Sequence, residues 1–342
     1  MKAAIFNPYL DSLGGGERYT LAVARALADK DYKVHVQWED ASIADKLKER
    51  FGISLDGIEF IKDIKRGDSY DVCFWVSDGS IPLLRARCNL LHFQVPFTQV
   101  DGKTLINRMK LIRINKVVAN SHFTKRFIDR EYGVKCEVVY PPVDTESFMP
   151  KVKKNMILFV GRFSQLVQSK NQDVLVKAFK KFTKEGYGDW KMVLAGGVEV
   201  GVGDYIKKLK RTVGLYNVEI EESPSFSTIK NLFGQAKLFW TASGYGVDEE
   251  KEPHKAEHFG ISVVEAMSAG AVPLAYNAGG HVEIIKNEKD GFLWENINQL
   301  VRLSLKLAGD RKTLAEISDN SMRSSENFSY EKFYKNIIKL TL

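Results

Sequence analysis

The feature that most constrains the fold is an alternation of short apolar runs with helical patterns. In the first half of the chain, the runs rich in strand-forming residues are KAAIF, KVHVQW, DVCFWV, NLLHF, KVVAN and CEVVY. Helical patterns separate several of them, the clearest at residues 17–28. Strands that alternate with helices are typical of layered parallel α/β proteins. The first half therefore predicts one parallel sheet covered by helices.

The same alternation begins again after residue 155. The order is MILFVG, a helix at 172–184, KMVLAGG, a helix at 205–213, and then NVEIEE, KLFWTA and AVPLAY. The segment PPVDTESFMPKVKKN between the halves has three prolines and a basic end, which is typical of a linker. A chain of 342 residues also exceeds one ordinary domain of about 100–200 residues. We expect α/β domains at 1–150 and 151–320, with the cleft between them as the default ligand site.

The end of the chain predicts a further helix. Phe333, Ile337 and Leu340 are spaced so that they share one helical face. We expect residues 321–342 to form a C-terminal helix that packs back on the first domain.

Charge and cysteine content narrow the partners and the location. The net charge is +7 and the pI is near 9.0, which indicates anionic partners without choosing among nucleic acid, anionic lipid and phosphorylated small molecules. The three cysteines stand singly, with no CxxC pattern. The first residues lack the pattern of a signal peptide, and no apolar run approaches the roughly 20 residues of a membrane span. We expect a cytoplasmic protein.

One stretch, residues 103–126, carries seven Lys or Arg and no Asp or Glu. Within it, Leu105, Ile106, Met109 and Ile112 have helical spacing. One interpretation is an amphipathic helix on a membrane surface. The commoner one is a surface helix whose apolar side packs on the core.

A glycine-rich segment, GGGERYTLAVARAL, follows the first strand. Gly14, Gly15 and Gly16 allow a close approach of backbone to a ligand, and the following helix N-terminus suits a phosphate. The pattern is neither GxGxxG nor GxxxxGK[ST]. The alternative is a flexible turn in which Glu17 offsets the helix dipole.

The second domain opens with a strand, a loop and a helix in ILFVGRFSQLVQSKNQDVLVKAF. Arg162 leaves the end of the strand, and Lys170 stands just before the helix. Two cations at the carboxyl end of a parallel strand can neutralise a diphosphate leaving group, Arg as a planar fork and Lys as a point charge. The alternative is two solvated loop cations.

The segment EHFGISVVEAMSAG carries two glutamates, Glu257 and Glu265. Ser262 and Glu265 match a capping box, which gives Glu265 a structural role. Glu257 has no such role, and it ends a long irregular segment of the kind that is often functional. The N–H groups at the start of the following helix offer a place for an anion.

Histidines do not indicate a metal site. His92 ends an apolar strand, a position more often occupied by a structural residue. The other histidines lack metal-ligand spacing, so no metal is predicted.

In their order and spacing, these motifs resemble the retaining nucleotide-sugar glycosyltransferases of family 4. The matching pieces are Gly14–Gly16 with Glu17, His92, ANSHFTK, VGR ending in Arg162, Lys170 with Asn171, EHFGISVVEAMSAG, and GG with Glu283. The segment EHFGISVVEAMSAGAVPLAYNAGG also resembles the dolichol-linked-oligosaccharide α-1,2-mannosyltransferases. The loop FSQLVQS is more apolar than is usual in the family, and the segment before Glu257 is long and acidic.

The resemblance implies the GT-B fold, with two Rossmann-like domains facing each other across a cleft. It also implies residue roles. Arg162 and Lys170 hold the donor diphosphate, Glu257 lies near the transferred sugar, and His92 lines the sugar and acceptor side, which makes these four the catalytic set. The implied donor-binding residues are Gly14, Gly15, Gly16, Arg162, Lys170, Phe259, Gly260, Ile261 and Glu265, of which Glu265 binds the ribose hydroxyls.

The implied activity is retaining transfer of a sugar, with mannose favoured, from a nucleotide-diphosphate sugar to an acceptor. GDP-mannose or a UDP-sugar is the expected donor, and a glycan or polyprenyl-linked sugar the expected acceptor. No metal, other cofactor or nucleic acid is expected, and residues 103–126 suggest a peripheral position at the inner membrane face. Two alternatives stay open: a sugar-nucleotide 2-epimerase on the same fold, and a non-catalytic glycan- or nucleotide-binding subunit.

Overall fold

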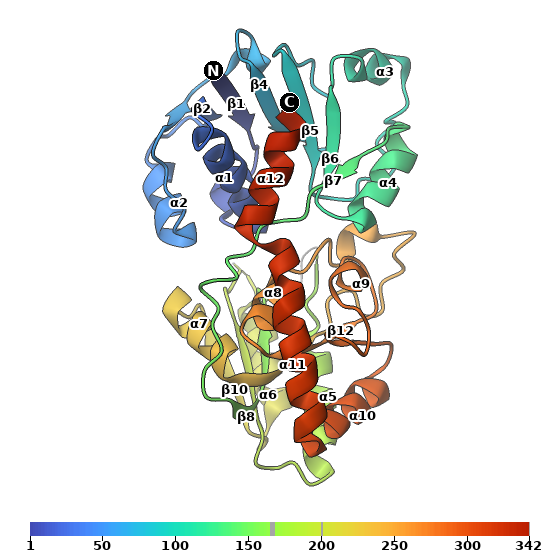
Figure 1. Ribbon diagram of the computed structural model, residues 1–342. Coiled ribbons are helices and arrows are strands. Elements are labelled where there is room, and N and C mark those ends of the chain that lie inside the picture. Colours follow the sequence, from blue (N-terminus) through green and yellow to red (C-terminus); the bar gives the residue numbers. More distant parts are fainter. Residues whose placement is uncertain (165–167, 200, 342) are drawn as a thin grey trace. The chain divides into compact units, whose positions relative to one another are not determined.

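The chain divides into two compact units, each with its own parallel sheet. The computed structural model describes residues 1–164, 168–199 and 201–341 (Figure 1). Unit 1 comprises Met1–Pro142 and Tyr330–Leu342, and unit 2 comprises Val143–Ser329. Both units are Rossmann-like, so the predicted α/β class is confirmed.

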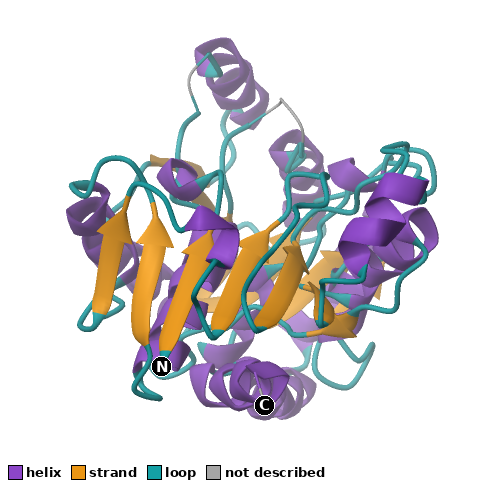
Figure 2. Cartoon of the chain, turned by 90° about the horizontal axis from the view of Figure 1, so that it is seen from above, coloured by secondary structure: helices purple, strands orange, loops and turns teal. Residues whose placement is uncertain are grey.

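Unit 1 contains a seven-stranded sheet in the order β3-β2-β1-β4-β5-β6-β7, with every pairing parallel. In Figure 2, neighbouring strands point the same way and helices lie on both sides of the sheet. Strands buried on both faces explain the continuous apolar runs in the sequence. The strands are β1 (Lys2–Phe6), β2 (Lys33–Gln37), β3 (Ile58–Ile61), β4 (Val72–Val76), β5 (Cys88–Phe93), β6 (Lys116–Ala119) and β7 (Glu137–Val138).

The last helix of the chain belongs to unit 1. Phe333, Ile337 and Leu340 of α12 are buried in the core that also holds residues of α1. The Phe333 ring meets the Tyr19 ring edge-on, with 4.9 Å between the centroids. The helices of unit 1 are α1 (Gly15–Ala28), α2 (Ile43–Phe51), α3 (Leu105–Leu111), α4 (His122–Tyr132) and α12 (Tyr330–Thr341).

Unit 2 contains a six-stranded parallel sheet in the order β10-β9-β8-β11-β12-β13. Its strands are β8 (Lys154–Val160), β9 (Lys191–Gly196), β10 (Val218–Glu222), β11 (Ala236–Thr241), β12 (Val272–Tyr276) and β13 (Phe292–Trp294). Its helices are α5 (Gln172–Lys184), α6 (Gly203–Val213), α7 (Phe226–Gln235), α8 (Ile261–Ser268), α9 (His281–Ile284), α10 (Ile297–Gly309) and α11 (Arg311–Ser325).

The segment between the units differs from the expected linker. The sequence placed the boundary at 150, whereas the units divide after Pro142 and again after Ser329. Phe148 is fully buried in unit 2, and the Ser268 hydroxyl donates to the Thr145 carbonyl at 2.6 Å. The prolines therefore lead into a stretch that packs on unit 2.

Both sheets have a reversal of strand order beside their first strand. In unit 1, β1 lies between β2 and β4, and in unit 2, β8 lies between β9 and β11. Ligands of open α/β sheets bind at the carboxyl ends of the strands where this reversal occurs. The glycine segment after β1 and the Arg162–Lys170 loop after β8 both start from these positions.

Candidate functional site

Loops that follow β8, β11 and β12 meet in unit 2 around one ion pair. Lys170, directly before α5, places its Nζ 2.7 Å from Oε2 of Glu257, which precedes α8. The side chains are only 13% and 18% exposed. Two predicted catalytic residues, 87 positions apart in the chain, thus form a largely buried salt bridge.

The charge of Lys170 decides the ionisation of Glu257. Burial alone would raise the pKa of this carboxyl, but the positive charge of Lys170 and its hydrogen bond lower the pKa to about 2, with further contributions from His281 and His258. Burial also lowers the pKa of His281, against the opposing effect of Glu257, so Lys170 is the main counter-charge at neutral pH. The site therefore holds a carboxylate and an ammonium in a partly dehydrated setting.

Side-chain amides fix the loop that carries Lys170. The Gln168 amide donates to the Ala256 carbonyl at 2.7 Å. The Asn171 amide donates to the carbonyls of Ala242 and Tyr245, at 3.0 and 3.3 Å. Asn171 has left-handed backbone angles (φ 50°, ψ 43°), which Asn tolerates better than most residues. These bonds tie the β8 loop to the β11 loop on either side of Lys170.

Two glycines hold the backbone of Glu257 from the β12 side. The Gly280 N–H donates to the Glu257 carbonyl at 2.7 Å, and the Gly279 N–H donates to the Glu249 carboxylate. A Cβ on Gly279 would overlap the Glu257 carbonyl, and one on Gly280 would overlap the backbone of Phe259. Only glycine permits this backbone-to-backbone packing.

The start of α8 differs from the predicted capping box. The helix begins at Ile261 and its N-cap is Gly260 (φ 113°), with no side-chain cap. Ser262 therefore lies inside the first turn, and Glu265 is the fifth helical residue, 8% exposed. The capping-box role of Glu265 is wrong, because the positive φ of Gly260 starts the helix early. Phe259 is 3% exposed and packs against Phe328, so only its backbone is left for a ligand.

Arg162 leaves the end of β8 but is directed toward another carboxylate. Its side chain is 60% exposed, and Nη1 lies 3.0 Å from Oε1 of Glu199, which follows β9. Its carbonyl accepts from the Gln172 amide at 3.0 Å. The structure thus fixes the Arg162 backbone beside α5 without joining its guanidinium to the Lys170–Glu257 pair. Residues 165–167 of the apolar loop lie outside the described residues.

The glycine segment of unit 1 is organised by Glu17. The Glu17 carboxylate accepts from the Gly14 N–H at 2.7 Å and from the Ser12 hydroxyl at 2.8 Å. Glu17 thereby closes a capping box at the start of α1. The structural alternative was a flexible turn in which Glu17 offsets the helix dipole, whereas these hydrogen bonds fix the turn. Gly15 is exposed, and the Gly16 carbonyl accepts from the Gln94 amide at 3.2 Å.

His92 is placed in the interior of unit 1. Its side chain is 0% exposed, and its ring is stacked on Tyr19 at 4.2 Å and tilted against Phe74 at 5.2 Å between centroids. Burial lowers the pKa of His92 to about 3, so the ring is neutral at physiological pH. The placement agrees with the structural role weighed as the alternative for His92, and its assignment to the sugar and acceptor side stays a prediction.

Three residues at the site were missed or undervalued by sequence analysis. His281 was set aside for lack of metal spacing, yet it is buried, directly follows Gly279–Gly280, and bonds through Nδ1 to the Tyr276 carbonyl at 3.0 Å. No sequence motif includes Glu199, because its contact with Arg162 arises only from the pairing of β8 with β9 in the sheet. Asn171 was noted only as a neighbour of Lys170. Its amide bonds reach carbonyls more than 70 positions away, which no sequence pattern near Asn171 predicts.

Other features of the described chain add no second site. No cluster of three or more His, Cys, Asp or Glu side chains among the described residues is placed to hold a metal ion. None of the described helices is both long enough and apolar enough to span a bilayer. All three cysteines are free.

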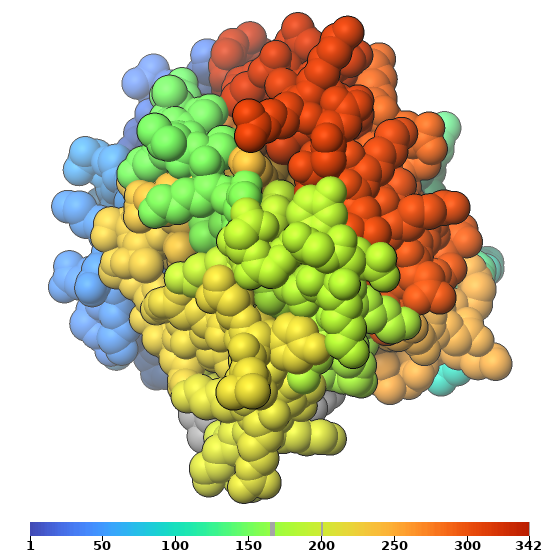
Figure 3. Space-filling view, turned by 90° about the horizontal axis from the view of Figure 1, so that it is seen from below, coloured from blue at the N-terminus to red at the C-terminus, as the bar shows by residue number. Residues whose placement is uncertain are grey.

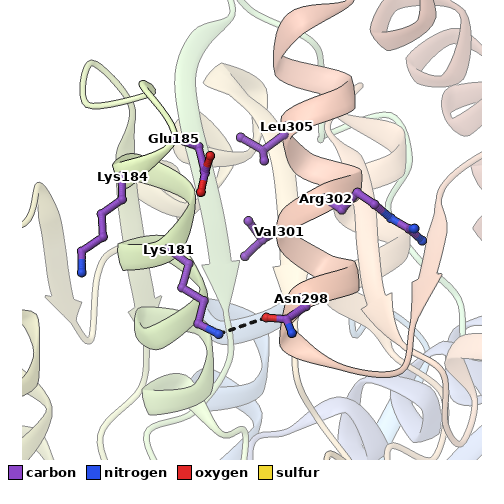
Figure 4. Close-up of a pocket in the computed structure, with 7 residues that line it drawn as sticks. All are labelled: Lys181, Lys184, Glu185, Asn298, Val301, Arg302 and Leu305. Atoms are coloured by element: carbon purple, nitrogen blue, oxygen red, sulfur yellow. Dashed lines mark hydrogen bonds between the residues drawn. The ribbon is translucent and has the colours of Figure 1, made fainter.

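A shallow groove lies between α5 and α10, away from the ion pair. Its volume is about 390 Å³, and Lys181 donates to Asn298 across it at 3.0 Å (Figure 4). In the view of unit 2 from below, the yellow-green chain near residue 185 borders the orange-red α10 (Figure 3). Figure 4 shows Lys184 and Arg302 pointing away from the groove, so its cations do not converge on a ligand.

Two Rossmann-like units, each with its loops gathered at the carboxyl ends of a parallel sheet, are typical of the GT-B glycosyltransferase class. The family model "Glycosyl transferases group 1" matches residues 144–323, more than half of the chain. The chain belongs to this family, and the resemblance seen in the sequence is confirmed.

Relatives and solved structures agree with this assignment. The chain is 26% identical to the GDP-Man:Man(3)GlcNAc(2)-PP-Dol alpha-1,2-mannosyltransferase of Dictyostelium discoideum, over 67% of this chain and 46% of that protein. It is 27% identical to Alpha-1,3/1,6-mannosyltransferase ALG2 of Candida glabrata, over 62% of this chain and 53% of that protein. The chain thus spans about half the length of these relatives. HepE of Anabaena, solved with UDP and glucose, shares the fold: the TM-score is 0.75 over 99% of this chain and 98% of that one, at 18% identity.

Proposed function

We propose that the chain is a retaining hexosyltransferase that moves mannose from a nucleotide-diphosphate sugar to a glycan or lipid-linked acceptor. The observation that carries the proposal is the buried Lys170–Glu257 pair, held beside the N-terminus of α8 in a group 1 glycosyl transferase. This arrangement gives one site an ammonium, a carboxylate and a helix N-terminus. Transfer from a diphosphate donor requires these kinds of group.

The proposal assigns the leaving group to the cationic side of this site. When the sugar–oxygen bond breaks, negative charge grows on the diphosphate, and fixed positive groups stabilise it. Lys170 supplies a point charge in a setting with little water, and the N–H groups at the start of α8 add partial positive charge. Arg162 joins them by exchanging its contact with Glu199 for donor phosphate oxygens, because its side chain is 60% exposed and its ion pair faces solvent.

The sugar and the ribose are assigned to the two glutamates. The pKa of Glu257 lies far below neutral pH, so Glu257 is a carboxylate at neutral pH and not a proton donor. It is assigned to accept hydrogen bonds from sugar hydroxyls and to act as a counter-charge to an oxocarbenium-like transition state. Glu265, one and a half turns into α8, is assigned to the ribose hydroxyls. Backbone groups of Phe259, Gly260 and Ile261 lie between the two carboxylates along the chain.

The donor and acceptor are inferred from the relatives. Two of them are named as mannosyltransferases, and one name includes GDP-mannose and a dolichol-linked acceptor. We take GDP-mannose as the first donor to test and UDP-sugars as the second, since HepE binds UDP and glucose. The cations and the α8 N-terminus take the place of a divalent metal in this proposal, so EDTA should leave transfer unchanged.

A thermal-shift panel of GDP-, UDP- and ADP-sugars tests the donor. Binding to the native state raises the unfolding free energy by RT ln(1 + [L]/Kd), about 2.7 kcal/mol at a hundredfold excess over Kd. For a unit of this size, that corresponds to a rise in melting temperature of roughly 5–10 °C. One sugar nucleotide should produce this shift, and Glu257→Gln should weaken it. A flat response across the panel contradicts the donor site.

The stereochemistry of the product tests the transfer. With the preferred donor and a dolichol-type or glycan acceptor, NMR of the product should show the same anomeric configuration as the donor. An inverted linkage contradicts the retaining mechanism. Conversion of the donor to a 2-epimer without acceptor supports the epimerase instead, and donor binding without turnover supports a binding subunit.

A further inference from the structure

Helix α3 exposes its apolar side chains to solvent. Leu105, Ile106, Met109 and Ile112 are 74%, 67%, 62% and 82% exposed, and no residue of α3 is buried. The expectation that this apolar side packs on the core is therefore wrong. Four large apolar side chains together on one short helix differ from the single exposed ones that are normal on protein surfaces.

The opposite side of the segment holds it on unit 1. Leu111 and Ile114 are partly buried and pack on the cluster that contains Leu91 and Phe93. The Thr104 hydroxyl accepts from the Asn107 N–H at 3.3 Å and caps the start of the helix. Figure 1 shows α3 at the outer edge of unit 1. The outward direction of the apolar side is thus set by packing and capping.

Basic side chains surround this apolar side. At 100° per residue, Arg108 and Lys110 lie on its two flanks, with Lys103 before the helix and Arg113 after it. Within the described part of the chain, no carboxylate lies at salt-bridge distance from these four cations. By contrast, Lys116 pairs with Glu137 and Lys125 with Asp129, both at 2.5 Å.

We propose that residues 103–113, the α3 surface, dock unit 1 onto a bilayer that contains anionic lipid. The apolar side chains would enter the boundary between headgroups and acyl chains, and the four cations would lie at the level of the lipid phosphates. A second copy fits less well, because an isologous contact through the same surface would bring like charges together. The proposal stands on unit 1 alone and does not depend on the proposed transfer reaction.

Vesicle flotation of the full chain tests the proposal. Vesicles of neutral phosphatidylcholine are compared with vesicles that contain about one third phosphatidylglycerol, at low and high salt. We expect the protein to float with the anionic vesicles and to be released as salt rises, because screening weakens contacts between the cations and the lipid phosphates. Each basic residue contributes about fivefold to the binding constant, so Arg108→Gln with Arg113→Gln should lower it about 25-fold.

A second pair of substitutions tests the apolar contribution. Ile106→Asp with Ile112→Asp should lower binding at least as much, since it places carboxylates at the membrane boundary. The matched controls are Lys208→Gln with Arg211→Gln for charge and Val152→Asp with Leu215→Asp for exposed apolar residues of unit 2. Control variants should float like the original protein.

Four outcomes overturn the proposal. They are no flotation with anionic vesicles, equal and salt-independent binding to neutral vesicles, equal loss in the matched controls, and concentration-dependent dimers that disappear in the Ile106→Asp, Ile112→Asp variant while vesicles stay unbound. The last outcome would assign the α3 surface to a second copy of the chain.

Discussion

The two sheets share one order over six strands, with β7 added in unit 1, but the groups at their carboxyl ends differ in chemistry. In unit 1, Glu17 caps α1 at this edge, and His92 is a buried, neutral ring enclosed by aromatic side chains. In unit 2, the corresponding edge retains a charged pair, Lys170 and Glu257, with little exposure to water. A parallel sheet therefore determines where its loops gather, and the side chains on those loops determine what can be bound there.

The costs of these two arrangements also differ. A buried ion pair adds little net stability over an apolar pair, whereas a single member left alone is strongly destabilising. An enclosed neutral histidine is stable until acid forces it to take a proton. The predictions below use these differences to separate the two units.

The largest effect is expected for Lys170→Ala. It leaves the Glu257 carboxylate buried without its main counter-charge, which should cost about 3 kcal/mol of unit 2 stability. Glu257→Gln in the same chain should recover a large part of that loss, because the uncompensated charge is removed. Amide hydrogen exchange in α5 and α8 measures the stability of unit 2 by itself. Transfer activity should stay at least a hundredfold low in both variants.

The control for this cycle lies on α5, the helix that follows Lys170. Lys177 pairs with Asp173 at 2.9 Å, but both side chains are largely exposed. Lys177→Ala should therefore change stability by less than about 0.5 kcal/mol. If Lys170→Ala costs no more than Lys177→Ala, the Lys170–Glu257 pair is an ordinary surface pair and the contrast between the units disappears.

An intermediate effect is expected from the acid sensitivity of His92. Its pKa is about 3 in the folded chain and about 6.5 when unfolded, so the unfolded state takes up the proton first as pH falls. The contribution of the neutral ring to the free energy of unfolding is full well above pH 6.5 and is lost progressively as the pH falls to about 3. Between pH 6.5 and 4.5 the loss amounts to about 2.3 kcal/mol. His92→Phe should abolish this part of the pH dependence.

Hydrogen exchange in β1 and β5 at pH 6.5 and 4.5 measures this effect within unit 1. His35 is present in both proteins, and His281 belongs to unit 2. Neither residue therefore changes the difference in pH-dependent stability of unit 1 between the original protein and His92→Phe. At pH 8 the two should differ only through ring packing. An unchanged pH dependence in His92→Phe would mean that the ring is protonated, and hence hydrated, in the folded chain.

The sequence predicted the framework better than the orientation of its parts. The long apolar runs correspond to strands in both sheets, but β3 and β13 were not predicted, because their few apolar residues stand among or beside charged ones. Lys170 and Glu257 were predicted as site residues, yet no local pattern reveals a bond between residues 87 positions apart. In α3, the helical period is the same whether the apolar side faces core or solvent, so only packing through Leu111 and Ile114 decides it.

The smallest effect tests how Lys170 is positioned. Asn171 combines left-handed backbone angles with two amide bonds to the β11 loop. Asn171→Gly keeps the backbone conformation and loses the bonds, whereas Asn171→Ala loses the bonds and adds about 1 kcal/mol of backbone strain. We expect the donor KM to rise about fivefold in the glycine variant and further in the alanine variant. In the protein without donor, the Glu257 carboxyl should stay ionised in both variants.

A helix cap on a neighbouring loop provides the matched control. Ser225 accepts from the Thr228 N–H at 3.1 Å and caps α7, which follows β10 at the same edge of the sheet. Ser225→Ala should cost about 1 kcal/mol of stability without changing the donor KM, because it loosens a helix and leaves the Lys170 loop in place. If the three variants raise the KM equally, general loosening of unit 2 accounts for the effect. If the Asn171 variants alone raise the donor KM, the Asn171 amide bonds position the Lys170 ammonium. Unit 2 would then differ from unit 1 both in the charged pair at this edge of the sheet and in the loop backbone that holds the pair in place.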